Sequence, residues 1–503
     1  MKGILKIYFW QILSLVSGFA TMFIVTPYLS SNQNYFGIYS FVISLNLFLS
    51  YADFGFLSAG IKYAAEAFIQ KDKEQEYKIL GFVLFIMFTM FALFAVMIFY
   101  GYLNPSIALK GIESADELQV AKDLLLIFLA SLPITLLHRI IQLIFNIRLE
   151  DFKYQRVYAI VNLVKIGIAV ILFHFFEYPI ITYYFIFQLL NLVVVLIGFL
   201  LAKKDYDYNF RLFFKYCKFN KVIYSKIKGL AYGSLILTIS WVLYYEIDSI
   251  VIAKIASLKD VALFSVCLSL MTFARSLFGI IYNPFSVKFN HYIGLGSTDK
   301  LNAAYRTVIL FGVPLSIFAT LIVVFSMDKL ILLWVGSQYE PAISIIKIMF
   351  LIYLFNFVTS PGGIAVVAKN KLKEMYFVSI FLPLIYWVGV VFTFNRLGIL
   401  SFAIFKLVAF ALYAIFYLYF SSRYMAVDWK DFVSKNAIGI VLGLVIIGVI
   451  SSTIGPLLPV KKSVAHLLIY FSYVGGLFTL TCLAFFAFSK DFRNSLTSLL
   501  ARR

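Results

Sequence analysis

The chain has 503 residues, of which 62% are hydrophobic and only 13% are charged, and its formal net charge is +19. Ordinary soluble domains are about 45–50% apolar and about 25% charged. The composition therefore excludes a soluble enzyme, a disordered protein and a fibrous protein. It predicts an all-α polytopic membrane protein, in which each pass needs ~20 apolar residues.

The hydropathy pattern predicts about 14 transmembrane helices. Helices rather than barrel strands are expected, because these apolar runs are longer than the alternating segments of about ten residues found in membrane barrels. The first run lacks a cleavage site of small residues, so we interpret it as a retained helix and not as a signal peptide. The predicted spans are 8–30, 36–58, 79–103, 123–147, 155–175, 179–202, 229–253, 261–285, 305–326, 341–367, 376–395, 398–420, 437–455 and 464–488.

The distribution of Lys and Arg predicts the orientation. With the N-terminus in the cytoplasm, 30 of the 43 Lys and Arg residues fall at the inner ends, 8 fall in outer loops and 5 lie within spans. Cytoplasmic loops carry such an excess, so both termini are expected in the cytoplasm. The net charge is mainly this topology signal and predicts no nucleic-acid partner. The basic run 203–228 is expected to be an amphipathic linker on the inner membrane surface.

No catalytic or metal-binding motif is present. The three cysteines and four histidines are scattered along the chain, so neither a disulfide framework nor a metal site is predicted. The sequence contains no Walker A or G-x-S-x-G motif, which argues against an enzyme and against a pump that carries its own nucleotide domain. We expect no catalytic residues, no metal and no cofactor, apart from a coupling H+ or Na+.

An internal repeat is predicted at an offset near 225 residues. Polar residues of segment 39–48 recur in 264–273, and those of 72–78 recur in 299–306. Chance similarity between apolar helices is the alternative. Six spans on each side of the basic run predict two parallel six-helix halves around a central cavity, as in secondary transporters, plus two extra C-terminal helices. The predicted divisions are an N-terminal half 1–202, a linker 203–228, a C-terminal half 229–420 and a C-terminal part 421–503.

Segment 52–67, which reads ADFGFLSAGIKYAAEA, resembles the end of helix 2 in bacterial polysaccharide flippases. These proteins carry an Asp-x-Gly there, followed by a basic residue and an Ala-rich stretch. Segments 26–29 and 37–40 also resemble that family, which belongs to the multidrug/oligosaccharidyl-lipid/polysaccharide exporter superfamily. The resemblance implies export of lipid-linked sugar units, of the kind used for O-antigen, lipopolysaccharide or capsule, across the bacterial inner membrane.

Charged residues within spans are candidates for the substrate site, because a charge at mid-bilayer costs roughly 2.5–3.5 kcal/mol. Arg275 lies midway along its span, beside a polar face that includes Ser269 and Thr272. Lys165 and Arg139 lie within the fifth and fourth spans. We predict that these five residues bind substrate. Structural salt bridges, or snorkelling of Arg139 to the interface, are the alternatives.

Three acidic residues are candidates for ion coupling or gating. Asp53 lies toward the inner end of the second span, where a salt bridge to Lys62 is the alternative. Glu246 and Asp248 lie on the outer part of the seventh span, and residues two apart do not share a helix face.

Other features of the spans have simpler explanations. Lys347 and Lys406 lie near outer span ends, where snorkelling is expected. Five prolines in or near spans are expected to kink helices: Pro27, Pro133, Pro314, Pro361 and Pro383.

The predicted function is a flippase that moves undecaprenyl-diphosphate-linked oligosaccharide to the outer leaflet by alternating access. A cation-coupled drug or small-solute antiporter of the same superfamily is the alternative, and a membrane-embedded polysaccharide polymerase is a third. The excess of cationic over acidic residues within spans favours an anionic substrate. The expected partners are the lipid-linked glycan, the bilayer, a polysaccharide polymerase and other assembly proteins.

Overall fold

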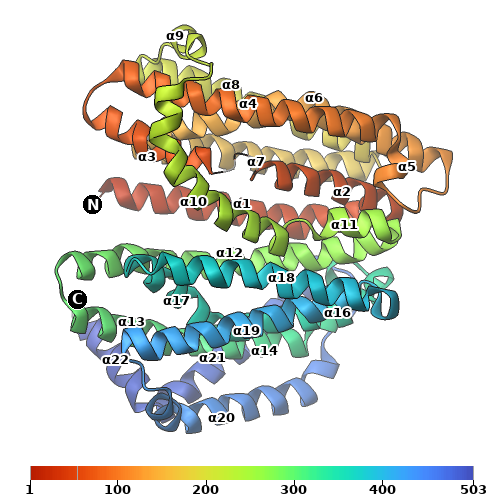
Figure 1. Ribbon diagram of the computed structural model, residues 1–503. Helices are drawn as coiled ribbons and strands as arrows, with labels where there is room; N and C mark the ends of the chain where they lie inside the picture. Colours follow the sequence, from red (N-terminus) through yellow and green to blue (C-terminus); the bar gives the residue numbers. More distant parts are fainter. Residues whose placement is uncertain (1, 52, 54, 502–503) are drawn as a thin grey trace. The chain divides into compact units, whose positions relative to one another are not determined.

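The computed structural model describes residues 2–51, 53 and 55–501. All regular secondary structure within these residues is helical, with no strand among them, which confirms the predicted all-α class. The chain forms two compact units, Met1–Ser265 and Val266–Arg503 (Figure 1). These units are defined by contacts within each of them, whereas the predicted halves 1–202 and 229–420 rest on a sequence repeat. The predicted halves and the linker 203–228 therefore stay predictions.

Unit 1 is built from the first eleven helices and the start of α12. Its longest helices pack against one another, with α6 contacting both α4 and α8, and α1 contacting α7. The helices are α1 (Lys2–Leu29), α2 (Gln33–Leu49), α3 (Phe56–Ile69), α4 (Lys73–Leu103), α5 (Pro105–Ala108), α6 (Ala115–Asn146), α7 (Asp151–Phe175), α8 (Ile180–Tyr206), α9 (Phe210–Lys215), α10 (Lys221–Tyr245), α11 (Asp248–Ile255) and α12 (Leu258–Gly294).

Unit 2 contains the rest of α12 and the remaining helices. Within it α18 packs on α19, and α20 packs on α21. The helices are α13 (Thr298–Val313), η1 (Pro314–Phe318), α14 (Ala319–Phe325), α15 (Met327–Trp334), η2 (Ser337–Tyr339), α16 (Ala342–Phe350), η3 (Leu351–Phe355), α17 (Asn356–Ala368), α18 (Leu372–Leu397), α19 (Leu400–Met425), α20 (Trp429–Thr453), η4 (Gly455–Leu457), α21 (Val464–Phe488) and α22 (Lys490–Ala501).

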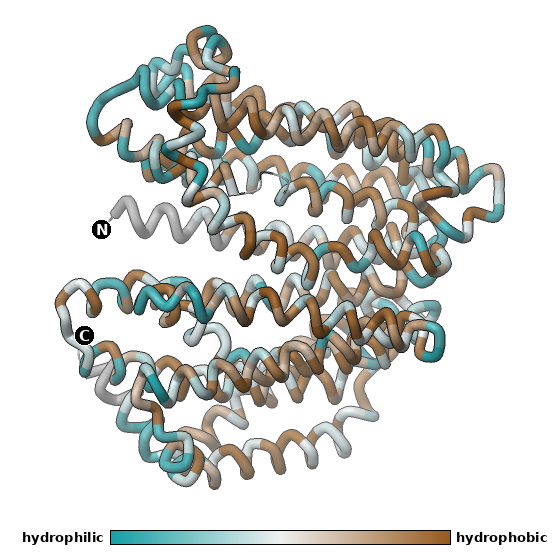
Figure 2. Tube along the Cα trace, viewed as in Figure 1, coloured by the Kyte–Doolittle hydropathy of each residue, from teal (hydrophilic) through white to brown (hydrophobic). Residues whose placement is uncertain are grey.

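Twelve helical segments of the described chain are long and apolar enough to cross a membrane. Hydrophobic residues run along their lengths, and hydrophilic residues gather at helix ends and loops (Figure 2). The other two predicted spans correspond to α1, whose part Val16–Leu29 is apolar, and to α2 with α3. The predicted all-α polytopic fold is therefore confirmed, with twelve candidate spans among the described residues.

Several predicted spans are broken helices. The second span stops at Leu49 and restarts at Phe56, and the seventh is interrupted between Tyr245 and Asp248. Among the five prolines expected to kink helices, Pro314 starts the π-helical turn η1, whereas the other four lie inside helices. Hydropathy averaged over a whole span does not show such breaks, because each of these spans is apolar on average.

The basic run 203–228 does not form one surface helix. It comprises the end of α8, the short helix α9 and the start of α10. Phe213 of α9 is buried, α9 packs on α4, and the backbone N–H of Asn209 donates to the Tyr77 hydroxyl at 3.1 Å. The Phe213 side of α9 therefore packs against protein, while Phe214 is 45% exposed, and the location of the run at the inner membrane surface stays a prediction.

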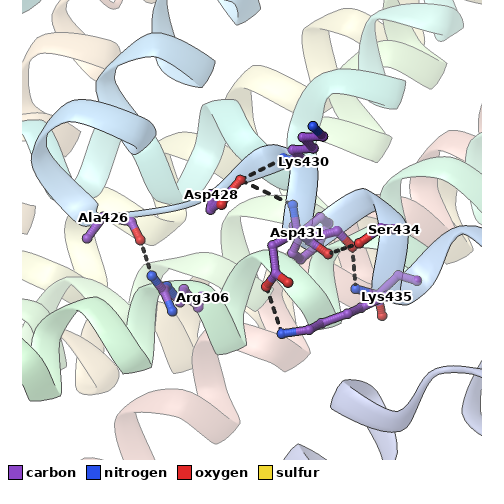
Figure 3. Close-up of polar contacts among 9 residues, drawn as sticks. Arg306, Ala426, Asp428, Lys430, Asp431, Ser434 and Lys435 are labelled. Carbon is purple, nitrogen blue, oxygen red and sulfur yellow. Dashed lines mark hydrogen bonds and ion pairs between the residues drawn. The ribbon is translucent and has the colours of Figure 1, made fainter.

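Polar side chains close the helix ends of unit 2 near α19 and α20 (Figure 3). The Arg306 guanidinium donates to the Ala426 carbonyl, where the chain leaves α19 at a φ of 52°. The Asp428 carboxylate accepts hydrogen bonds from the backbone of Lys430 and Asp431, and so caps α20. Such caps contribute about 1 kcal/mol each, so this cluster has a structural explanation.

Candidate functional site

A polar cavity lies inside unit 1. Its volume is about 440 Å3, and it is surrounded by residues of α2, α3, α6, α7 and α8. No carboxylate occurs among the described residues that line it. The cavity therefore offers cationic and neutral hydrogen-bonding groups. Its polar lining residues are Asn46, Ser50, Thr135, His138, Arg139, Gln142, Asn146, Tyr158 and Asn191.

Arg139 places a guanidinium at this cavity, as predicted for a charged residue within a span. The charge of Asp53 and the Tyr51 side chain act on it electrostatically. Within the described chain, however, no carboxylate comes within the 4.0 Å of an ion pair with Arg139. A guanidinium has five N–H donors and no acceptor. Arg139 is therefore suited to bind an anionic or hydroxyl-rich ligand in the cavity.

Asp53 lies in the break between α2 and α3. Its carboxylate accepts a hydrogen bond from the backbone N–H of Leu57 at 3.0 Å, and its carbonyl accepts one from Phe56 at 2.9 Å. It is 8% exposed. The alternative, a salt bridge to Lys62, is wrong, because the Lys62 ammonium lies over the Tyr63 ring. Asp53 therefore restarts the helix that carries part of the cavity wall.

Gly55 is the glycine of the Asp-x-Gly motif in segment 52–67, of which positions 52 and 54 lie outside the described residues. Its φ is +79°, a left-handed conformation that L side chains rarely adopt. A Cβ at this position would lie 2.5 Å from the Ala231 carbonyl oxygen of α10. Glycine thus permits both the turn and the close approach of α10.

Gly55→Ala is expected to destabilise the protein. A left-handed alanine costs roughly 1–2 kcal/mol, and the contact with Ala231 adds repulsion. The thermal unfolding midpoint of the purified protein should fall. The matched control is Gly101→Ala in α4, where nothing lies within 4 Å of the added methyl group. Equal midpoints for the two variants would contradict this role of Gly55.

Lys165 lies behind the cavity wall. It is 3% exposed, and its ammonium donates to Asn191 at 2.7 Å and to Asn162 at 3.4 Å. The same ammonium lies 3.9 Å from the Phe187 ring centroid, and the Asn191 amide donates to Gln188 at 2.9 Å. Asn191 and Phe187 line the cavity, whereas Lys165 does not. Lys165 therefore holds the side chains of these two lining residues in place.

His138 is also fixed by α7. Its Nδ1 is 2.7 Å from the Tyr154 hydroxyl, and its ring lies 5.6 Å from the Tyr158 ring. Tyr158 in turn lines the cavity beside Arg139. The cavity wall therefore combines a fixed imidazole, an aromatic ring and a guanidinium.

The other predicted substrate residues belong to unit 2. Arg275, Ser269 and Thr272 lie on α12, and Arg275 is half-buried. The Tyr353 hydroxyl donates to the Met271 carbonyl and interacts with the Arg275 charge. The predicted site residues are thus divided between the two units, with Arg139 and Lys165 in unit 1. Their common role in substrate binding stays a prediction.

Glu246 and Asp248 flank a helix break that the sequence did not reveal. Glu246 follows the last residue of α10 as its C-cap, and Asp248 begins α11. They are 8% and 0% exposed. They do not sit on one continuous helix, so the expectation of two faces of the same helix is wrong. Among the described residues, no group of three His, Cys, Asp or Glu side chains is placed to hold a metal ion.

Lys406 does not snorkel as expected. It is 1% exposed in unit 2, and its ammonium lies 4.9 Å from the Tyr386 ring centroid. The packing of α18 on α19 encloses a side chain that the sequence places near a span end. This expectation is therefore wrong.

A second cavity of unit 1, of about 520 Å3, has a structural explanation. On its lining, Arg148 pairs with Glu76 at 2.8 Å, while Glu150 pairs with Lys153 at 2.7 Å and accepts from the Tyr206 hydroxyl at 2.6 Å. Burial raises the pKa of Glu150, but the hydrogen bonds from Lys153 and Tyr206 prevail and hold this pKa below its ordinary value. These pairs tie the ends of four helices together.

Most neutral residues of the cavity lining were not among the site residues predicted from the sequence. Asn46 of α2 and Ser50, which caps the C-terminus of that helix, are four residues apart, and Gln142 and Asn146 are four apart on α6, so each pair has helical spacing. Asn191 follows Gln188 by three residues on α8. Amide pairs at helical spacing inside spans were the signal that could have found them, because polar groups are costly in lipid.

Comparison with known proteins agrees with this architecture. Residues 1–287 match the family described as polysaccharide biosynthesis protein. The structure resembles the lipid II flippase MurJ in an inward closed conformation, with a TM-score of 0.68, 16% identity and coverage of 96% of this chain and 98% of that one. No curated protein matches the chain.

Multidrug transporters show the same fold. An inward-facing MATE family transporter of the MOP superfamily has a TM-score of 0.64 and 14% identity, and the match covers 81% of this chain and 94% of that one. A MATE protein in a bent conformation has a TM-score of 0.56 and 14% identity, with 84% and 95% covered. These identities show a shared fold. The family match spans more than half of the 503 residues, and on this ground the chain belongs to the polysaccharide biosynthesis protein family.

Proposed function

We propose that the protein flips an undecaprenyl-diphosphate-linked oligosaccharide from the inner to the outer leaflet of the bacterial cytoplasmic membrane by alternating access. The observation that carries this proposal is the cavity of unit 1, which presents the Arg139 guanidinium without a lining carboxylate. Arginine binds phosphate in a bidentate manner. The amides donate and accept hydrogen bonds as sugar hydroxyls require, and the Tyr158 and Phe187 rings offer apolar faces to a sugar ring.

The two alternatives fit this site less well. A cation-coupled drug antiporter calls for acidic groups at the site, but the described cavity lining holds none. A polymerase or ligase calls for a large outer loop with catalytic residues. The longest predicted outer loop, 104–122, contains the four-residue helix α5 and leads directly into α6. For these reasons, we favour lipid-linked transport over both alternatives.

We assign Asp53, Glu246 and Asp248 as candidates for coupling to H+ or Na+, or for gating. Asp53 is suited to gating because it both restarts α3 and interacts with the Arg139 charge. Glu246 and Asp248 are suited because they flank a helix break. O-antigen or a related cell-surface polysaccharide is the proposed pathway, with a polymerase acting on the exported unit.

Reconstitution of the full chain in liposomes tests the function. A lipid-linked oligosaccharide added to the inner leaflet should appear outside, where a membrane-impermeant glycosidase or lectin detects it. Liposomes without protein set the background rate. Export of a cationic dye together with no appearance of the lipid-linked glycan would favour the antiporter.

The proposed orientation is tested by cysteine labelling. Single cysteines at Asn32, Ser114 and Thr453, which are exposed, should react with an impermeant thiol reagent added outside the cell, because the Lys and Arg bias puts them there. A cysteine at Gln75 should react only after the membrane is permeabilised. The native residues Cys217, Cys267 and Cys482 are replaced beforehand. Labelling of position 75 in intact cells would overturn the orientation.

A further inference from the structure

The amide of Asn191 has a fixed orientation in the cavity wall. The Lys165 ammonium lies 2.7 Å from it, and an ammonium carries hydrogen-bond donors and no acceptor. The Asn191 atom that faces Lys165 must therefore be the carbonyl oxygen, and the amide nitrogen donates on the other side, to the Gln188 oxygen at 2.9 Å. An amide nitrogen has two N–H groups, so Asn191 keeps a second donor for a ligand in the cavity that it lines.

The imidazole of His138 is oriented by a hydroxyl of α7. Its Nδ1 lies 2.7 Å from the Tyr154 hydroxyl. Tyr154 is 1% exposed, and within the described chain its hydroxyl has no second hydrogen-bond partner. A buried O–H group without an acceptor is costly, so this hydroxyl donates to Nδ1 and the ring proton is placed on Nε2. His138, which also lines the cavity, therefore offers an N–H donor.

One face of α7 carries both orienting groups. Tyr154 and Lys165 are about three helical turns apart on α7, so they lie on the same side of it. The Tyr154 ring stacks on the Phe145 ring of α6 at 5.7 Å, and the Lys165 ammonium lies 3.9 Å from the Phe187 ring centroid of α8. A single helix thus orients one lining residue of α6 and one of α8.

Stability does not explain the ammonium of Lys165. The side chain is 3% exposed, its hydrogen bonds go to the neutral amides of Asn191 and Asn162, and no carboxylate of the described residues forms an ion pair with it. Burying a charge without an opposite charge is unfavourable. An apolar side chain of similar length would fill the same space without this cost, so the ammonium indicates a role in the cavity.

We propose that α7 sets the hydrogen-bond polarity of the cavity, so that His138, Arg139 and Asn191 present N–H donors together and bind the diphosphate of the lipid-linked substrate. Phosphate oxygens are strong acceptors, whereas a sugar hydroxyl both donates and accepts. Lys165 and Tyr154 are then positioning residues, which select an acceptor-only head without touching it. The inference rests on the proposed function for the identity of the substrate, and it assigns the diphosphate to the part of the cavity beside α7.

Binding of two lipids that share one tail tests the proposal. Farnesyl diphosphate and farnesyl glucoside are titrated against the full chain in phosphatidylcholine nanodiscs, and empty nanodiscs give the background. Lys165→Met should weaken diphosphate binding about tenfold and glucoside binding less than about twofold, because a donor to a charged group loses its orientation. Tyr154→Phe should weaken diphosphate binding about threefold, with the same selectivity. Equal losses for the two lipids, or no loss for the diphosphate, would overturn the proposal.

Further variants separate orientation from charge and from folding. The losses caused by Lys165→Met and Asn191→Ala should not add in the double variant, because Lys165 acts through Asn191; full additivity would contradict this. The control Lys406→Met removes a buried ammonium from unit 2 and should leave both affinities unchanged. Lys165→Met should also keep or raise the thermal unfolding midpoint, because it removes a buried charge. A lower midpoint with loss of both lipids would show a merely structural role.

The wild-type protein separates failure of this inference from failure of the proposed function. If it binds farnesyl diphosphate and exports glycan, and Lys165→Met binds the diphosphate equally well, then the role of α7 alone is wrong. If it neither binds farnesyl diphosphate nor exports glycan, the proposed function fails and this inference fails with it. Lys165→Arg, which keeps the charge and the donors, should retain most of the selectivity for the diphosphate.

Discussion

Arg139→Ala is expected to reduce export of the lipid-linked oligosaccharide by roughly a hundredfold, because a hydrogen bond that involves a charged group contributes up to ~3 kcal/mol. Arg139→Lys should retain part of the activity, since the positive charge survives but bidentate phosphate geometry is lost. The measurement is the rate at which glycan appears outside proteoliposomes, normalised to the amount of protein in the membrane.

A second variant distinguishes substrate binding by Arg139 from the electrostatic effect of Arg139 on Asp53. Arg139→Ala also removes the positive charge that acts on this buried carboxylate. If the loss of export arose only from the uncompensated charge of Asp53, the double variant Arg139→Ala/Asp53→Asn would export as well as Asp53→Asn alone. If Arg139 binds substrate, the double variant should remain inactive. Normal export by Arg139→Ala at normal membrane abundance would show that the cavity guanidinium does not contact the substrate.

The span positions could be predicted closely because each apolar run is bounded by polar residues. The predicted span 464–488 coincides with α21, and 341–367 corresponds to α16, η3 and α17. Insertion into lipid depends on local composition and length, and both are visible in sequence. The start and end of each membrane span are therefore determined by nearby residues in the sequence.

The helix breaks could not be predicted from composition. The turn at Asp53 and Gly55 depends on the carboxylate that accepts from Leu57 and on the close approach of α10. The break at Glu246 and Ile247 lies between the aromatic end of α10 and the start of α11. Such breaks depend on tertiary packing that satisfies the freed backbone groups, and this packing joins residues far apart in the sequence.

The candidate site was only partly predictable for the same reason. The cost of a charge in lipid singled out Arg139 and Lys165, but it did not distinguish a cavity lining from a support. The structure makes that distinction, because Lys165 contacts Asn191 and Phe187 of α8 whereas Arg139 lines the cavity itself. The burial of Lys406 also depends on a neighbouring helix.

Collapse of a negative-inside membrane potential is expected to slow export strongly. A diphosphate head carries about two negative charges, and moving each charge outward across ~100 mV is favoured by ~2.3 kcal/mol. Two charges that cross the full field gain roughly 4–5 kcal/mol, which corresponds to an outward accumulation of about a thousandfold. The measurement is the outward appearance of the lipid-linked oligosaccharide in proteoliposomes that hold a potassium diffusion potential.

The charge of the head supplies the control for this prediction. A lipid-linked glycan with a monophosphate head carries about half the charge, so its accumulation should respond to the potential with about half the free energy. H+ and Na+ gradients are clamped at zero, because a coupling ion at Asp53, Glu246 or Asp248 would add a driving force of its own. An unchanged export rate under these conditions would refute potential-driven export. It would leave the proposed flippase function in place, since the proposed binding of the head at the Arg139 cavity does not depend on which gradient drives export.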